Sequence, residues 1–247
     1  MGALSFGLAQ GASLRALGAT APKREGRASC YLDAMCGRAS LIAPTEALEE
    51  FLALEEPPPA TAPRYNIAPS QPLLIARSEA AGRVARMLTW GLLRDKKAII
   101  NLRSEGVAKG AMRASLRERR CVIPMTGFYE WRRSGKATQP YNVRRRDQGV
   151  FGVAGLWEAG ALGERCVVLT TRASSLVEPI HDRMPLILDP ASIGAWLDPA
   201  ADADRLLTEV HPLGDGDLEA YAVSPLVNSP SVDDPRCLEP ARDASLW

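Results

Sequence analysis

The stretch Val150-Phe151-Gly152-Val153-Ala154-Gly155-Leu156-Trp157 is a short apolar run, and runs of this kind recur along the chain. Apolar segments of this length, rich in β-branched and aromatic residues and bounded by glycine, proline or charge, favour β-strands. Further runs predict strands over residues 73–76, 84–90, 121–124, 141–145, 167–171 and 186–188. The sequence therefore predicts a fold dominated by many short strands.

Helical patterns are few. Residues 44–52 begin with a proline, carry early acids and have their apolar residues on one face, which predicts a helix. Helices are also predicted over 104–119 and over 190–197, the latter with Asp189 as its N-cap. Strict alternation of strand and helix is missing, so a doubly wound fold is disfavoured. We predict an α+β fold: a single compact domain with a barrel-like, mainly antiparallel sheet core flanked by short helices.

Composition excludes several classes of protein. The chain has 247 residues, of which 46% are hydrophobic, enough for one large domain or two small ones. Five cysteines without a CxxC pair and only two histidines predict neither a disulfide framework nor a metal site, and no cofactor-binding loop is recognisable. No apolar run reaches 18 residues, so a membrane is not an expected partner.

Charge is divided unevenly along the chain. The net charge is only +1, which by itself disfavours a globally basic nucleic-acid binder. Residues 101–150, however, carry twelve Lys and Arg against four Asp and Glu, whereas residues 198–247 carry three against eleven. The basic segment fits either a solvated face or a phosphate-binding surface.

The amino-acid composition changes at Met35. The first 34 residues are rich in alanine and glycine and show no periodicity. We expect residues 1–34 to be an extension that is disordered, cleaved, or placed before a true start at Met35. We assign residues 35–235 to the folded domain and residues 236–247 to a C-terminal tail.

Cys36 has a special chemistry if it becomes the first residue. A free α-amine with a pKa near ~8 would then adjoin a thiol with a pKa near ~8.5, so usable fractions of both nucleophiles exist at neutral pH. The amine condenses with an aldehyde to a Schiff base, and the thiol then closes a five-membered thiazolidine ring. The alternative is that Cys36 is a small buried hydrophobic residue.

Five further residues are candidates for catalysis or for binding. Burial of Glu130 among the aromatic residues around it would raise its pKa, as a general acid/base near neutrality requires, although Glu130 is also free to pair with an arginine. Trp131 fits either a core residue or a platform for a base. Asn101 suits either a structural role in a turn or a role in orienting a nucleophile. Arg103 suits either a solvated surface cation or a ligand for phosphate. His181 fits a structural histidine or a proton donor.

Together these segments resemble the SOS response-associated peptidase (SRAP) family of abasic-site-processing proteins. Seven motifs stand in the family's order and span residues 35–230: Met-Cys-Gly-Arg at 35–38, Arg-Tyr-Asn-Ile-Ala-Pro-Ser at 64–70, Trp-Gly-Leu at 90–92, Asn-Leu-Arg-Ser-Glu at 101–105, Gly-Phe-Tyr-Glu-Trp at 127–131, Ala-Gly-Leu-Trp-Glu at 154–158 and His-Asp-Arg-Met-Pro at 181–185. Two departures are visible: Asn101-Leu102-Arg103-Ser104-Glu105-Gly106 replaces the family's Asn-Ala-Arg-x-Glu-Thr, and the second tryptophan found in many members after Trp90-Gly91 is missing.

The resemblance implies that Cys36, exposed by loss of the preceding residues, attacks the ring-opened aldehyde of an abasic site in single-stranded DNA and forms a thiazolidine crosslink. It implies that Glu130 is the general acid/base, that Asn101 positions the amine and the sugar, and that His181 helps to open the deoxyribose ring. The implied DNA contacts are phosphate ligands at Arg38, Arg103 and Arg183 and lining residues at Asn66, Pro69 and Trp131.

The implied partner is single-stranded DNA containing abasic sites, bound in a basic groove by a monomer without metal or cofactor, with replication-fork proteins as further partners. The expected location is the bacterial cytoplasm at the nucleoid, or the nucleus in a eukaryote. The family name reflects a proposed autoproteolysis that frees the cysteine. Two other functions stay open: a thiol-dependent peptidase acting on its own extension, and a non-catalytic module that binds single-stranded or modified DNA.

Overall fold

The computed structural model describes residues 1, 2, 36–95, 97–210 and 212–241. By its contacts the chain divides into Met1–Cys30 and Tyr31–Trp247. Of the first unit only Met1 and Gly2 are described, and both are exposed. The rest of the predicted extension lies outside the described residues. The second unit contains both main sheets and all the helices of the described chain.

The larger of two main sheets contains five strands whose pairings close on themselves. These strands are β3 (Pro72–Glu79), β4 (Gly82–Trp90), β8 (Arg120–Met125), β11 (Phe151–Gly160) and β12 (Gly163–Arg172). Each is antiparallel to the next, and the parallel pairing of β12 with β4 completes the ring. The short strands β7 (Asn101–Arg103), β13 (Arg183–Pro185) and β14 (Ile187–Leu188) extend this sheet to eight strands.

A second sheet of five strands carries Glu130. Its order is β15 (Leu218–Ala222), β10 (Ala137–Arg145), β9 (Gly127–Ser134), β1 (Ala39–Leu41) and β2 (Arg64–Ile67). The chain crosses from β8 of the first sheet to β9 of the second at Thr126, whose N–H donates to the carbonyl of Ser40 at 2.8 Å. A hairpin of β5 (Leu92–Arg94) and β6 (Lys97–Ile99) stands apart from both sheets.

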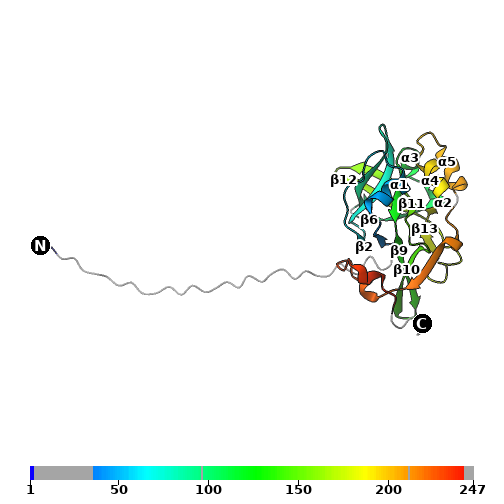
Figure 1. Cartoon of the computed structure of the whole chain (residues 1–247). Coiled ribbons are helices and arrows are strands. Elements are labelled where there is room, and N and C mark those ends of the chain that lie inside the picture. Colours follow the sequence, from blue (N-terminus) through cyan, green and yellow to red (C-terminus); the bar gives the residue numbers. More distant parts are fainter. Residues whose placement is uncertain (3–35, 96, 211, 242–247) are drawn as a thin grey trace. The chain divides into compact units, whose positions relative to one another are not determined.

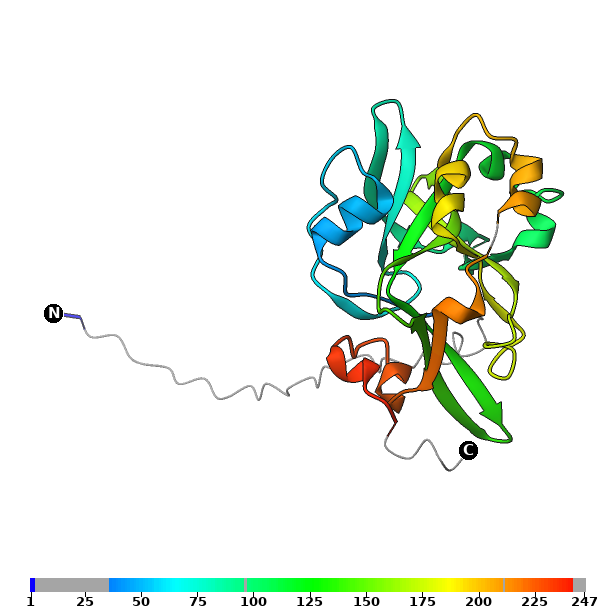
Figure 2. The same ribbon diagram turned by 45° about the vertical axis from the view of Figure 1, so that its right-hand side comes forward.

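Short helices flank the sheets (Figures 1 and 2). The α-helices are α1 (Thr45–Leu52), α2 (Ser104–Val107), α3 (Arg113–Glu118), α4 (Pro190–Leu197) and α5 (Ala203–Glu209), and the 3-10 turns are η1 (Asp215–Asp217), η2 (Pro225–Asn228) and η3 (Pro235–Leu238). As predicted, Asp189 caps α4, its carboxylate accepting from the N–H of Ser192 at 2.6 Å. None of the helices within the described ranges is long and apolar enough to cross a membrane.

The prediction of α+β class is confirmed, and each predicted strand has a counterpart in the structure. One helix prediction is wrong: residues 104–119 form two short helices rather than one. Gly106 and Gly110 lie between the two starts, and glycine disfavours a helix interior by about 1 kcal/mol relative to alanine. The apolar runs also failed to predict β9, the strand that carries Glu130.

Tight packing explains the glycines of the central run. A Cβ added at Gly155 would lie 3.0 Å from Sγ of Cys121 and 3.1 Å from the carbonyl of Val167. Two buried tryptophans tie the surrounding strands together, because Trp90 donates to the carbonyl of Ile100 at 3.0 Å and Trp196 to that of Cys121 at 2.9 Å. The core of the ring is therefore close-packed.

Candidate functional site

Cys36 and Glu130 meet where β1 and β9 pair. These strands are antiparallel, with Ala39 opposite Phe128. Cys36 lies three residues before β1 and has a φ of 47°, which turns the chain as it enters the strand. Its backbone N–H donates to Oε1 of Glu130 at 2.7 Å. Both residues are buried, Cys36 to 3% exposure and Glu130 to 2%, so this contact is shielded from water.

The surroundings raise the pKa of the Cys36 thiol and the pKa of the Glu130 carboxyl. Burial raises the pKa of the Cys36 thiol well above its ordinary value, and the neighbouring Glu130 carboxylate raises it further. Burial also raises the pKa of Glu130, while hydrogen bonds from Cys36 and the nearby His181 partly offset the rise. The thiol is therefore neutral near pH 7, and a carboxyl with a raised pKa is suited to exchange a proton with the nitrogen it touches.

Asn101 reaches the same place from the other sheet. It is the first residue of β7, which runs parallel to β12 with Asn101 beside Val168. Its Nδ2 lies 3.5 Å from the carbonyl oxygen of Cys36, at the long limit of a hydrogen bond. The amide of Asn101 therefore stands next to the main chain of Cys36.

His181 approaches from the loop before β13. Its Nδ1 accepts the N–H of Arg183 at 3.1 Å, so the neutral ring carries its proton on Nε2. Oδ1 of Asp182 lies 3.0 Å from the same nitrogen. The charge of a protonated His181 lowers the pKa of Glu130. Of the four residues predicted as catalytic, whose roles stay predictions, Cys36 contacts both Glu130 and Asn101, and His181 acts on Glu130 through its charge.

Arg38, Asn66 and Trp131, predicted to contact DNA, form a separate cluster. Successive side chains of a strand point to opposite faces, so Trp131 lies on the other face of β9 from Glu130. Nη1 of Arg38 donates to Oδ1 of Asn66 at 2.9 Å, and the guanidinium lies 5.9 Å from the centre of the Trp131 ring. The indole N–H of Trp131 donates to Oδ1 of Asn228 at 2.7 Å.

The other residues predicted to contact DNA, Arg183, Arg103 and Pro69, differ in solvent exposure. Arg183 is buried, and its guanidinium binds both carboxylate oxygens of Glu105, at 2.6 and 2.9 Å, and the carbonyl of Thr170 at 2.7 Å. Arg103, at the end of β7, is exposed, and Pro69 is half-buried in the turn after β2. Of the three predicted phosphate ligands, Arg103 alone presents an exposed side chain.

The basic segment and the acidic C-terminal part partly neutralise each other. Arg113 and Arg117 of α3 both bind Asp204 of α5, at 2.7 and 3.1 Å. Arg144 of β10 binds Glu219 of β15 at 2.8 Å. The uneven charge along the sequence therefore has a structural role in joining these elements, besides any role in binding phosphate.

Three polar residues near these clusters were not singled out from the sequence: Glu105, Asn228 and Asp233. Glu105 lies within a recognised motif, but its partner Arg183 is far away in the chain. Asn228 and Asp233 lie among serines and prolines, a composition that predicts turns without saying what the turns contact. Their partners become visible only in the fold.

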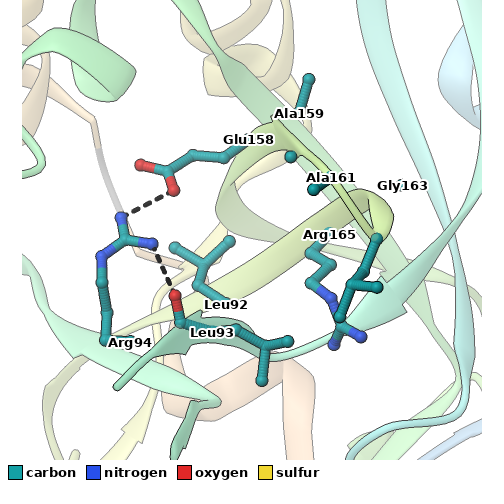
Figure 3. Close-up of a pocket in the computed structure, with 10 residues that line it drawn as sticks. Leu92, Leu93, Arg94, Glu158, Ala159, Ala161, Gly163 and Arg165 are labelled. Carbon is teal, nitrogen blue, oxygen red and sulfur yellow. Dashed lines mark hydrogen bonds and ion pairs between the residues drawn. The ribbon is translucent and has the colours of Figure 1, made fainter. Parts of the chain in front are cut away.

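A cavity of about 260 Å³ opens between β5 and the hairpin joining β11 to β12 (Figure 3). Arg94 and Glu158 form an ion pair at its edge, at 2.6 Å, and Arg165 donates to the carbonyl of Gly91 at 3.0 Å. None of the four clustered residues lines this cavity. Among the described residues, no group of three or more His, Cys, Asp or Glu side chains is arranged to hold a metal ion.

Comparison with known proteins identifies relatives over most of the chain. YoqW of Bacillus subtilis (strain 168) is 35% identical over 222 residues, which cover 83% of this chain and 99% of YoqW. YobE of the same organism is 36% identical over 215 residues, 80% of this chain and 98% of YobE. Both are named abasic site processing proteins.

The fold is also found among solved structures. The crystal structure of a protein from Bacteroides thetaiotaomicron matches with a TM-score of 0.73 and 22% identity, covering 83% of this chain and 100% of that one. The family model described as SOS response associated peptidase (SRAP) matches residues 35–230. The match spans the site and both sheets, and the chain belongs to the SRAP family.

Proposed function

We propose that this protein processes abasic sites in single-stranded DNA by forming a covalent thiazolidine crosslink through Cys36. The observation that carries the proposal is the 2.7 Å contact between the nitrogen of Cys36 and the Glu130 carboxylate. A general acid/base placed on the reacting nitrogen is what Schiff-base chemistry requires. The names of YoqW and YobE support abasic DNA as the substrate.

The reaction balances with the groups of this chain alone. The ring-opened abasic sugar carries an aldehyde, and the free α-amine of Cys36 attacks its carbon. A C–N bond forms, and one water leaves to give an imine. The thiol sulfur then adds to the imine carbon while the thiol proton passes to the nitrogen. The product is a five-membered ring that contains the nitrogen, sulfur and former aldehyde carbon, with no oxidation or reduction.

Glu130 serves both steps. Its raised pKa lets it take a proton from the attacking amine and return it to the departing hydroxyl. Because the thiol of Cys36 is neutral when buried, its proton also needs an acceptor as the sulfur attacks, and the Glu130 carboxylate is adjacent. Asn101 holds the Cys36 main chain, and His181 supplies a proton to the sugar oxygen as the ring opens.

Binding and chemistry are divided between different residues. An abasic site has no base to be read, so its recognition rests on phosphates and on neighbouring bases. The exposed Arg103 is placed two residues from Asn101, where it binds a phosphate flanking the lesion. This division predicts that loss of Arg103 weakens DNA binding while leaving the bond-forming residues in place.

A second activity is suggested by the same contact. In the full chain the nitrogen of Cys36 belongs to the Met35–Cys36 peptide bond. Attack of the thiol on the Met35 carbonyl would form a thioester and release this nitrogen as an amine, with Glu130 donating the proton. Water would then hydrolyse the thioester and leave Cys36 as the first residue. We therefore propose self-cleavage as the step that matures the protein.

The crosslinking proposal is tested with protein that begins at Cys36. Incubation with a single-stranded oligonucleotide containing one abasic site should give a product whose mass is the sum of both components less one water. Cys36→Ala should give no stable adduct, because without the sulfur its amine forms only a reversible imine. Cys36→Ser retains the amine and tests the sulfur, since an oxygen closes the ring poorly. An adduct of equal yield and stability from Cys36→Ala would exclude the mechanism.

Maturation is tested separately by the intact mass of protein expressed from Met1. Self-cleavage predicts loss of residues 1–35 in the parent and retention of them in Cys36→Ala and Glu130→Gln. Equal loss in all three would assign the trimming to another cause. That result would leave the crosslinking proposal standing, because it requires only that the amine be free.

A further inference from the structure

The guanidinium of Arg38 donates three hydrogen bonds to neutral acceptors inside the protein. It is 6% exposed. Nη1 donates to Oδ1 of Asn66 at 2.9 Å and to the carbonyl of Val227 at 2.6 Å, and Nη2 donates to the carbonyl of Asn228 at 3.2 Å. In the part of the chain that the structure describes, no carboxylate lies within ion-pairing distance of it. Because Arg38 is buried, little of its guanidinium is open to a phosphate in solution.

The side-chain nitrogen of Asn66 contacts the same C-terminal segment. Its Nδ2 lies 3.1 Å from the carbonyl of Val227, 3.0 Å from that of Ser229 and 2.7 Å from that of Val232. With Arg38, the two side chains therefore satisfy four carbonyl groups between residues 227 and 232. Carbonyls that are buried without a partner are costly, so this turn depends on both side chains.

Asp233, in the C-terminal segment, accepts hydrogen bonds from the main chain of β2. Its Oδ1 accepts the backbone N–H groups of Tyr65 and Asn66, at 2.6 and 2.9 Å, and its carboxylate also pairs with Arg64. The residues that follow pack on the domain as well: Cys237 is buried, and Val223 pairs with Pro240. The packed chain thus extends beyond residue 235, the boundary expected from the sequence. Figures 1 and 2 show η2 and η3 beside the sheet that contains β2, β9 and β10.

This segment lies behind the strands that carry the site. The N–H of Tyr129 donates to the carbonyl of Arg38 at 3.0 Å, and the Tyr129 hydroxyl donates to the carbonyl of Tyr65 at 2.6 Å. Tyr129 directly precedes Glu130, and Arg38 follows Cys36 by two residues. The segment is therefore fastened to the rear face of β1 and β9, whose front brings Cys36 to Glu130.

We propose that Arg38 is a positioning residue: by fastening residues 227–233 behind β1 and β9, it fixes the nitrogen of Cys36 on the Glu130 carboxylate and binds no phosphate itself. This inference rests on the proposed function for its effect on rate. It differs from the role implied by the family resemblance, in which Arg38 holds a phosphate. Displacing a reacting group by about 1 Å slows a reaction by about a hundredfold.

The decisive experiment compares Arg38→Gln with Arg103→Gln in protein that begins at Cys36. Affinity for an intact single-stranded oligonucleotide, without an abasic site, is measured at several salt concentrations. Each phosphate neutralised on a single strand contributes about 0.7 to the slope of log K against log salt. We expect Arg103→Gln to lose about that amount and Arg38→Gln to keep the parent's slope. A loss of slope in Arg38→Gln equal to that in Arg103→Gln would overturn the proposal.

The second readout is the rate of adduct formation at saturating abasic DNA. We expect Arg38→Gln to be about ten- to a hundredfold slower than the parent, and Glu118→Gln, at an exposed position of α3, to keep the parent's rate. An unchanged saturated rate in Arg38→Gln would also overturn the proposal. If the parent itself forms no adduct, the proposed function fails, whereas the salt slopes still decide whether Arg38 binds phosphate.

A milder variant covers the case in which Arg38→Gln does not fold. Asp233→Asn weakens the same attachment and keeps Arg38 intact. We expect it to lower the saturated rate, to leave the salt slope unchanged and to speed hydrogen exchange at the N–H groups of Tyr65 and Asn66. Faster exchange at these groups with a saturated rate equal to the parent's would show that the attachment does not position the site.

Discussion

The backbone N–H of Cys36 donates to the Glu130 carboxylate at 2.7 Å, between a residue that enters β1 and a residue in the middle of β9. The two are 94 positions apart in the chain. Their contact joins a nitrogen, a thiol and a proton-exchanging carboxyl in one buried place. For an N-terminal cysteine this arrangement places a general acid/base at the amine.

Glu130 should carry a cost in stability. Because burial raises its pKa in the folded protein, the folded state holds the proton more tightly than the unfolded chain, in which the pKa is about 4.3. Stability should therefore fall as pH rises from that value through the raised folded pKa. We expect Glu130→Gln to be at least as stable as the parent at pH 7, with the difference shrinking at pH 4.

Urea unfolding of both proteins at the two pH values measures this difference. Glu178→Gln is the matched control, since Glu178 is exposed. A Glu130→Gln variant that is markedly less stable than the parent at pH 7 would show that the ionised carboxylate stabilises the fold.

The ion pair between Arg183 and Glu105 should stabilise the loop that carries His181. The hydrogen bond from Arg183 lowers the pKa of Glu105, so its contribution is present above the unfolded pKa of about 4.3 and is lost as pH falls through the lower folded value. We expect Glu105→Gln to cost about 1 kcal/mol at neutral pH, because Glu105 is half exposed and its carboxylate is only partly shielded.

Thermal unfolding at neutral and acid pH checks this effect, which should vanish in acid. The control is Glu118→Gln on the exposed face of α3, for which a change within about 0.5 kcal/mol is expected. Equal effects of the two substitutions would mean that the pair contributes nothing beyond an ordinary surface carboxylate.

Gly155 and Gly194 should respond in opposite directions to alanine. A Cβ at Gly155 would press on Cys121 and on the main chain of Val167, so Gly155→Ala should lower the free energy of unfolding by about 1–3 kcal/mol. At Gly194, inside α4, no atom lies within 4 Å of the added Cβ. Gly194→Ala should therefore raise it by about 0.5–1 kcal/mol. Denaturant midpoints of the two variants measure both signs, and a stabilising Gly155→Ala would contradict the close packing of the ring.

Local patterns were sufficient to predict the fold class and seven of the fifteen strands among the described residues. Apolar runs such as residues 150–157 correspond to strands because their side chains fill the ring or face the elements packed on it. β9 escaped prediction because its apolar first half contains Glu130 and its second half contains Arg132 and Arg133, so neither alternation nor a continuous apolar run is present. A charged residue in a buried strand is a mark of function rather than of the strand pattern.

The candidate site was predictable only as a set of motifs in a known order. The order named Cys36, Asn101, Glu130 and His181, and the fold brings them together. No pattern in the sequence connects Arg38 with Val227, 189 positions away, or Arg183 with Glu105. Such contacts depend on which turns dock on which sheet face, and turn composition alone does not specify that.

The most direct test compares protein that begins at Cys36 with the same protein carrying one additional residue before it, whose retention is checked by intact mass before and after the incubation because self-cleavage would remove it. Both keep the thiol, Glu130 and the DNA-binding surface, and they differ only in whether the nitrogen of Cys36 is an amine or an amide. We predict a heat-stable adduct with an abasic single strand from the first protein and none from the second, read by intact mass. Equal adduct from both proteins would contradict crosslinking through the α-amine of Cys36.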